Sequence, residues 1–172
     1  MLKEYFQRRS LRKGASKVPT ELIPLRKVRS AVVFIDVEDS AFSYCKDAVN
    51  YFFRDRRIKA DVFFFDFRRL SKDERLITSI TTTVLRKDLN WYGKPGKDKV
   101  DLMLSGQPDM FISLLSQPSY ALEYMASCSC ARFKVGRFDS PVFNLVFKDT
   151  PDKPLTEYEA FLEILKILDK VA

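Results

Sequence analysis

The stretch Ala31-Val32-Val33-Phe34-Ile35-Asp36 decides the fold of this 172-residue chain. Its apolar residues follow one another without a polar residue between them, and an acid ends the run. A strand with one face in water alternates apolar with polar residues, whereas a strand buried on both faces does not. We therefore expect residues 31–36 to form an inner strand of a parallel sheet.

The residues that follow complete a strand-helix-strand unit. Apolar side chains recur at helical spacing over residues 42–53, and Asp39 or Ser40 is expected to cap the start of this helix. A second wholly apolar run at 62–65 predicts the next strand. Two parallel strands joined by a helix form a crossover that is nearly always right-handed.

Strands and helices continue to alternate toward the C-terminus. We expect strands near 81–86, 109–115, 131–136 and 142–147, and helices at 98–106, after Pro118, and after a capping box of Thr156 and Glu159. The apolar face of the last helix is expected at Phe161, Leu162, Leu165 and Leu168. The pattern predicts an α/β fold, a Rossmann-like three-layer α/β/α sandwich with a mostly parallel sheet of order 3-2-1-4-5.

The net charge of +7 divides the chain into two parts. Residues 1–30 hold nine basic and two acidic residues, whereas residues 31–172 hold 21 of each. The first residues show a short helical pattern that ends at Gly14. This pattern carries a basic stripe, formed by Arg8, Arg9, Arg12 and Lys13. We therefore expect a basic N-terminal helix and connector over 1–30, and a single α/β domain over 31–172.

The composition argues against several classes of protein. The chain has no histidine, so it lacks the commonest general base and the most frequent ligand of transition metals. Three cysteines are too few for a disulfide framework, and Cys128 and Cys130 are expected to pack at a helix end. With no signal peptide and no apolar run that could span a membrane, the expected location is the cytoplasm.

The default ligand site of such a sheet is the loop after its first strand. Here the loop, residues 36–40, has three carboxylates and no glycine, so phosphate-cradling nucleotide sites are not expected. Asp36 and Glu38 resemble the first motif of haloacid-dehalogenase phosphatases, which implies a nucleophile, an acid and bound Mg²⁺. The alternative is an acidic cluster at a helix start, which needs no metal or other cofactor, and we favour it.

Two further groups of residues are candidates for binding. Trp91, Tyr92 and Lys94 form a loop that could stack on a base or sugar and contact phosphate, although such aromatics more often pack back on the body. The basic stripe could bind nucleic acid, an anionic membrane surface or an acidic protein, or remain a solvated helix face. The small apolar area of the N-terminal helix disfavours membrane insertion.

Two resemblances extend these expectations. Asn90-Trp91-Tyr92-Gly93-Lys94-Pro95, followed by Ala131-Arg132-Phe133-Lys134-Val135-Gly136, resembles an uncharacterised bacterial family, a domain of unknown function that implies no activity. The strand at 109–115 together with the one at 131–136 is similar to the amino-terminal half of heptosyltransferase-type glycosyltransferases. That resemblance implies an acceptor-side half, because this chain has no room for the donor-binding half.

The function expected from sequence is therefore that of a non-enzymatic binding domain. Its basic N-terminal segment, within residues 1–29, would contact an anionic partner, either nucleic acid or an acidic protein. The alternatives are a Mg²⁺-dependent phosphoryl-transfer enzyme and a residual glycosyltransferase-like domain.

Overall fold

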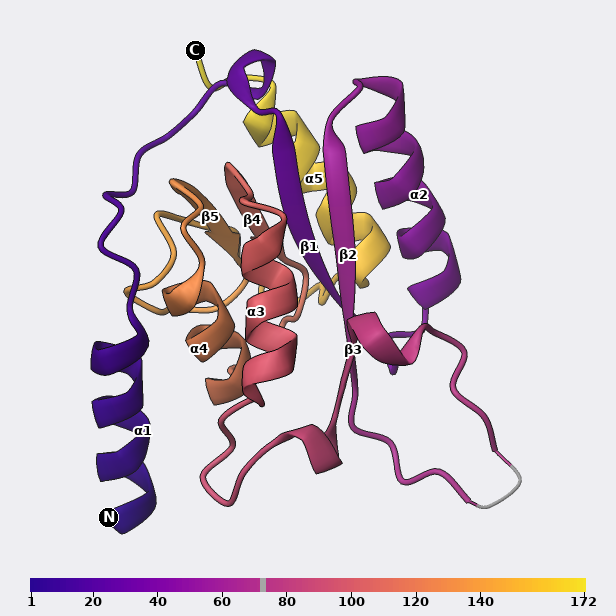
Figure 1. Cartoon of the computed structure of the whole chain (residues 1–172). Helices are drawn as coiled ribbons and strands as arrows, with labels where there is room; N and C mark the ends of the chain where they lie inside the picture. The colour runs from indigo at the N-terminus through magenta and orange to yellow at the C-terminus, as the bar shows by residue number, and fades with distance from the viewer. Residues whose placement is uncertain (72–73) are drawn as a thin grey trace.

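A parallel sheet covered by helices on both faces forms the body of the protein (Figure 1). The computed structural model describes residues 1–71 and 74–172. The strands are β1 (Ser30–Asp36), β2 (Lys59–Asp66), β3 (Thr83–Leu85), β4 (Met110–Ser113), β5 (Phe133–Gly136) and β6 (Leu145–Val146). They pair in parallel in the order β3-β2-β1-β4-β5-β6. The predicted α/β fold and the order 3-2-1-4-5 are confirmed, and β6 is added next to β5.

The helices form the outer layers. They are α1 (Leu2–Gly14), α2 (Phe42–Asp55), α3 (Lys97–Ser105), α4 (Tyr120–Cys128) and α5 (Glu157–Leu168). α2 and α5 pack on one face of the sheet, and α3 and α4 pack on the other. α1 lies outside α4 and reaches β1 through a connector that is extended except for one 3₁₀ turn at Leu25–Lys27 (Figure 1).

β1 supplies side chains to both halves of the core, because successive residues of a strand point to opposite faces. Ala31, Val33 and Ile35 join the apolar cluster beneath α2 and α5. Val32 and Phe34 join the cluster beneath α3 and α4. The uninterrupted apolar run therefore forms a strand buried on both faces, as predicted.

Two expectations about the later elements were wrong in detail. β6 is only two residues long because the Asn144 side chain, rather than a strand backbone, accepts a hydrogen bond from the Lys134 N–H at 2.6 Å. In α5 the buried stripe includes Ala160, Phe161, Ile164 and Leu168. Leu162 lies one step around the helix from this stripe and is exposed.

Candidate functional site

The carboxyl end of β1 opens into a cavity of about 300 Å³. Its lining includes Asp36, Glu38 and Asp39 from the loop after β1, residues 115–119 from the loop after β4, and Glu157 from α5. Strand order reverses between β1 and β4, where open α/β sheets bind their ligands. The cavity therefore lies at the loop that the sequence identifies as the default site.

The acidic loop uses its carboxylates to hold backbone groups. Asp36 Oδ1 accepts a hydrogen bond from the Glu38 N–H at 2.9 Å. Asp39 accepts from the Ala41 N–H at 2.9 Å through Oδ1, and from the Glu157 N–H at 3.1 Å through Oδ2. The expected capping of α2 by Asp39 or Ser40 is wrong, because Ala41 occupies the cap position and Asp39 instead joins this loop to the start of α5.

Glu157 is a buried member of this site that sequence analysis missed. Its side chain is among the buried charged groups, and both carboxylate oxygens accept from the Asp36 N–H, at 2.9 and 3.1 Å. Burial raises the pKa of Glu157 to about 9, against the lowering effect of the Asp36 N–H, and the charges of Asp39 and Asp36 raise it further. The group is therefore protonated at neutral pH.

The donor set at this cavity is poorly suited to a divalent cation. One oxygen of Asp36 already accepts a hydrogen bond from the Glu38 N–H. Glu38 itself is exposed, and both oxygens of Glu157 accept from the Asp36 N–H. Across residues 1–71 and 74–172, no group of three or more His, Cys, Asp or Glu side chains could hold a metal ion.

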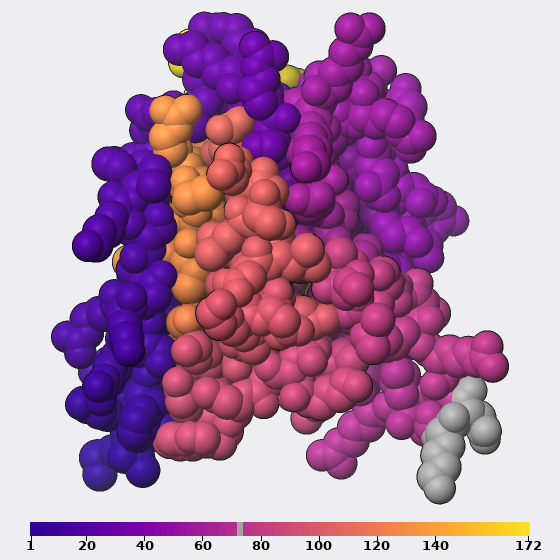
Figure 2. Space-filling model, in the orientation of Figure 1, coloured from indigo at the N-terminus to yellow at the C-terminus, as the bar shows by residue number. Residues whose placement is uncertain are grey.

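The N-terminal helix is docked on the body rather than free of it. Figure 2 shows α1, in indigo, along one flank of the molecule beside the loop before α3. The Phe6 ring stacks on Tyr92 with centroids 5.8 Å apart and meets Trp91 edge-on at 5.4 Å. Gln7 Nε2 donates to the Tyr92 carbonyl at 2.8 Å, and Ser10 Oγ and Tyr92 Oη lie 3.0 Å apart.

The opposite side of α1 carries the predicted basic stripe. All four of its side chains are exposed: Arg8, Arg9, Arg12 and Lys13. None of them forms an ion pair with a carboxylate of the described residues. Tyr5, which is 55% exposed, shares this side of the helix. The structure thus places the predicted anion-binding residues together on one open surface.

The structure separates the predicted ligand loop into two parts. Trp91 and Tyr92 pack toward Phe6, although Trp91 remains 62% exposed. Lys94 turns away from them and lies over the Tyr124 ring, with its Nζ 5.3 Å from the ring centroid. The aromatic residues of the loop therefore hold α1, and Lys94 belongs to another part of the surface.

Sequence analysis also did not identify two buried basic residues, one within β5 and one directly after it. Lys134 Nζ donates to the Ala126 carbonyl at 2.6 Å near the end of α4, and burial lowers its pKa. Arg137 donates to the Leu114 carbonyl and to both carboxylate oxygens of Asp149, all at 2.8 Å. The position of Arg137 just after a strand was the available signal, because ligand loops of parallel sheets begin there.

Within the described part of the chain, no helix is long and apolar enough to cross a membrane.

Comparison with family models matched residues 3–168 to the family of unknown function DUF6913. The match runs from α1 to α5 and confirms the expected uncharacterised family. Comparisons with curated proteins and with solved structures found no match. The similarity of residues 109–136 to glycosyltransferases therefore has no support.

Proposed function

Because the chain belongs to DUF6913, a family of unknown function, we propose its function from geometry alone. We propose a non-enzymatic binding domain that contacts the phosphate backbone of a nucleic acid through the basic face of α1, defined as Arg8, Arg9, Arg12 and Lys13. The observation that carries the proposal is that α1 is docked through its other side, so its cations face outward without acidic partners.

The positions of these residues around the helix support the proposal. At about 100° per residue, the basic face covers an arc of about 140°. The middle of that arc lies opposite Gln7 and Gly14, which face the body. Docking therefore fixes the direction in which the four cations point, and a partner meets them at a defined surface.

The electrostatics of the basic face favour a polyanion. Arg8 and Arg12, and likewise Arg9 and Lys13, stand four residues apart on the helix, where like charges repel. Phosphates placed between them would relieve this repulsion, and guanidinium groups bind phosphate in a bidentate manner. Tyr5 lies within the same arc, where its exposed ring can stack on an unpaired base. These features favour single-stranded nucleic acid over an acidic protein.

The proposal is tested by the salt dependence of binding to a fluorescently labelled single-stranded RNA. Four phosphate contacts predict a slope of log K against log[salt] of roughly −2.8. The double variant Arg8→Gln/Arg12→Gln should bind more weakly, with the slope reduced by roughly 1.4. The control Arg54→Gln/Lys59→Gln removes the same charge from exposed residues outside α1 and should keep the wild-type slope.

Two results would overturn the proposal. Equal losses in both double variants would show that binding follows net charge rather than the basic face. Binding of poly-glutamate in place of RNA, lost in the α1 variant only, would identify the partner as an acidic protein.

Phosphoryl transfer at Asp36 and Glu38 is the weaker alternative. The two residues line one cavity, but Asp36 Oδ1 already accepts a hydrogen bond from the Glu38 N–H. Mg²⁺-dependent hydrolysis of a phosphoester that Asp36→Asn abolishes would favour this alternative over the binding domain.

A further inference from the structure

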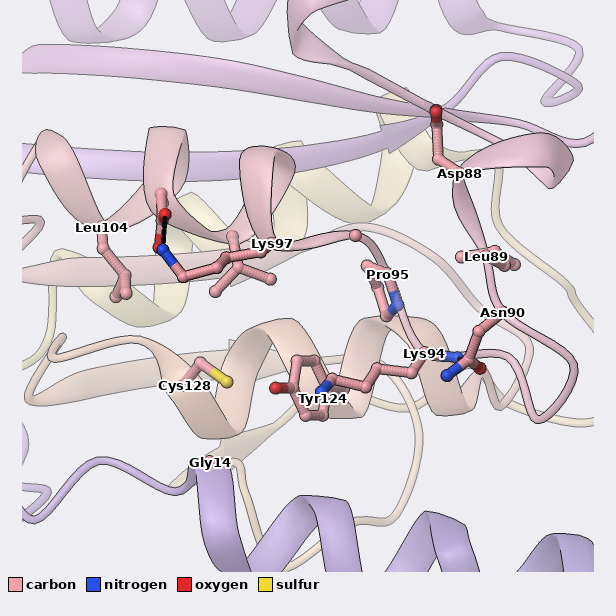
Figure 3. Close-up of a pocket in the computed structure, with 13 residues that line it drawn as sticks. Gly14, Asp88, Leu89, Asn90, Lys94, Pro95, Lys97, Leu104, Tyr124 and Cys128 are labelled. Carbon is pink, nitrogen blue, oxygen red and sulfur yellow. Dashed lines mark hydrogen bonds and ion pairs between the residues drawn. The ribbon is translucent and has the colours of Figure 1, made fainter.

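A second and larger cavity, of about 690 Å³, lies between the end of α1, the loop before α3, α3 and α4 (Figure 3). Its volume falls in the range of about 300–1,000 Å³ that is typical of sites for small organic molecules. The RNA-binding proposal assigns it no role, since the basic face of α1 points away from it.

The walls of this cavity are largely apolar. Leu89 and Pro95 from the loop and Val100 and Leu104 from α3 line one side, and Tyr124 of α4 lines the other. Figure 3 shows the Tyr124 hydroxyl and the Cys128 sulfur pointing toward one another along α4, between α3 and Gly14. Such walls suit a flat apolar body that packs against an aromatic ring.

Gly14 closes the cavity at the end of α1. A Cβ at this position would lie 3.1 Å from Tyr124 Oη and 3.2 Å from Cys128 Sγ. These contacts are tighter than ordinary van der Waals contacts, so a larger residue would press on α4. The glycine therefore permits the close approach of α1 that forms this wall.

The charged groups of the lining leave one cation without an acidic partner. Lys97 Nζ pairs with Asp101 Oδ2 at 2.7 Å, and Asp88 Oδ2 accepts the Leu85 N–H at 2.8 Å. Lys94 makes no ion pair with the carboxylates of the described residues. Figure 3 shows its side chain running along the cavity toward Tyr124.

The turn that carries Lys94 is fixed by local bonds. Asn90 Oδ1 accepts hydrogen bonds from the Tyr92 N–H at 3.1 Å and from the Lys94 N–H at 2.9 Å. Gly93 adopts a φ of 89°, a backbone conformation that other residues rarely take. The ammonium group is therefore presented from an ordered turn.

We propose that this cavity binds a small organic anion with a flat aromatic body. The aromatic body packs between Tyr124 and the apolar side chains of α3, and the acidic group of the ligand pairs with Lys94. The Lys94 ammonium, which lies over the Tyr124 ring, then contacts that ring and the acidic group of the ligand together.

The test uses two dyes of nearly the same shape. The first, 8-anilinonaphthalene-1-sulfonate, carries one anionic group, and the second, N-phenyl-1-naphthylamine, is neutral. Fluorescence titration of the native full-length protein should show one saturable site for each dye. Lys94→Gln should weaken binding of the anionic dye about tenfold, which is the effect of losing one charge-assisted contact. Its affinity for the neutral dye should stay within about twofold of the wild type.

Two further variants locate the site. Leu104→Trp fills the cavity from α3 and should weaken binding of both dyes. Lys87→Gln removes a nearby exposed cation outside the lining and should leave the affinity for both dyes unchanged. An unchanged affinity of the anionic dye in Lys94→Gln, or unchanged affinities of both dyes in a folded Leu104→Trp, would overturn the proposal. If Leu104→Trp does not fold, Lys94→Gln with the two dyes still decides the role of the cation.

Discussion

Glu157 makes the stability of the protein depend on pH through a single buried carboxyl group. Its ordinary pKa is 4.5, and burial at the start of α5 raises the pKa to about 9. Between these values the folded chain binds more protons than the unfolded chain, so the free energy of unfolding falls as the pH rises. The stabilisation by Glu157 is complete below its ordinary pKa of 4.5, and it is lost progressively as the pH rises from there through the raised pKa of about 9.

Replacement of Glu157 by Gln should remove this dependence. An amide does not ionise, and its oxygen can still accept the Asp36 N–H. Between pH 5 and pH 8, the free energy of unfolding measured in urea should fall by at least about 1.4 kcal/mol more in the wild type than in Glu157→Gln, which corresponds to about one pKa unit. Glu159→Gln, an exposed change in the same helix, should follow the wild type. Identical pH profiles for wild type and Glu157→Gln would contradict this account.

The roles of such residues could not be predicted because they depend on contacts between distant positions. Glu157 meets the backbone of Asp36, 121 positions away, and nothing in the first turn of a helix distinguishes a buried acid from an exposed one. Asp39 had the right chemistry for a cap, but it contacts α5 through one oxygen. By contrast, the apolar side chains of β1 were predicted correctly, since their burial follows from the local pattern.

At the scale of elements, α1 depends on its neighbours for its helical structure. Isolated helices shorter than about 12–15 residues are marginal in water. α1 has 13 residues, no fully buried side chain, and like charges four residues apart on its open side. Its docking contacts with Tyr92, Tyr120 and Ser127 therefore supply much of the stability of the helix.

Loss of one docking contact should loosen α1 while the sheet stays intact. Phe6→Ala removes the stacking on Tyr92 and should raise the hydrogen-exchange rates of the α1 amides about tenfold, which corresponds to an aromatic contact of about 1.4 kcal/mol. Leu2→Ala, a change at an apolar residue of the same helix that is 66% exposed, should leave these rates near wild type. Similar effects of the two variants would show that the stacked ring does not hold the helix.

The existence of the elements was predictable, but the partners of α1 were not. Helical spacing and Gly14 marked the helix itself. Its attachment needs Trp91 and Tyr92, more than 80 positions away, and aromatic residues in a loop fit a ligand site as well as a packing site. The predicted length of β6 was wrong for a related reason, because the Asn144 side chain replaces a backbone contact between the strands.

Across the whole molecule, the two core clusters lie on the faces of the sheet and owe little to the N-terminal helix. Leu11 packs against one cluster and is only partly buried. The charge of the chain follows the same division, since the net +7 comes from residues 1–30 and the rest is neutral. Folding and polyanion binding therefore rest on different parts of the chain.

A chain that lacks residues 1–17 should fold and lose salt-dependent RNA binding. Circular dichroism and urea unfolding should show one cooperative transition, with a smaller free energy of unfolding because the docking surface on α4 is uncovered. RNA binding should fall to the level of a control protein without a basic face. A product without a cooperative transition would show that α1 is part of the folding unit.

The sheet also limits how copies of the chain can associate. Its outer strands are its shortest, β3 with three residues and β6 with two. An exposed edge strand is a template on which another chain can add by backbone pairing, and a typical strand offers about five or six residues for this. The short β3 and β6 offer an incoming strand far less to pair with. Among the described strands, however, β3 pairs only with residues 64–66 of β2, so residues 59–63 of β2 are the longer stretch of open edge on which a second chain would add.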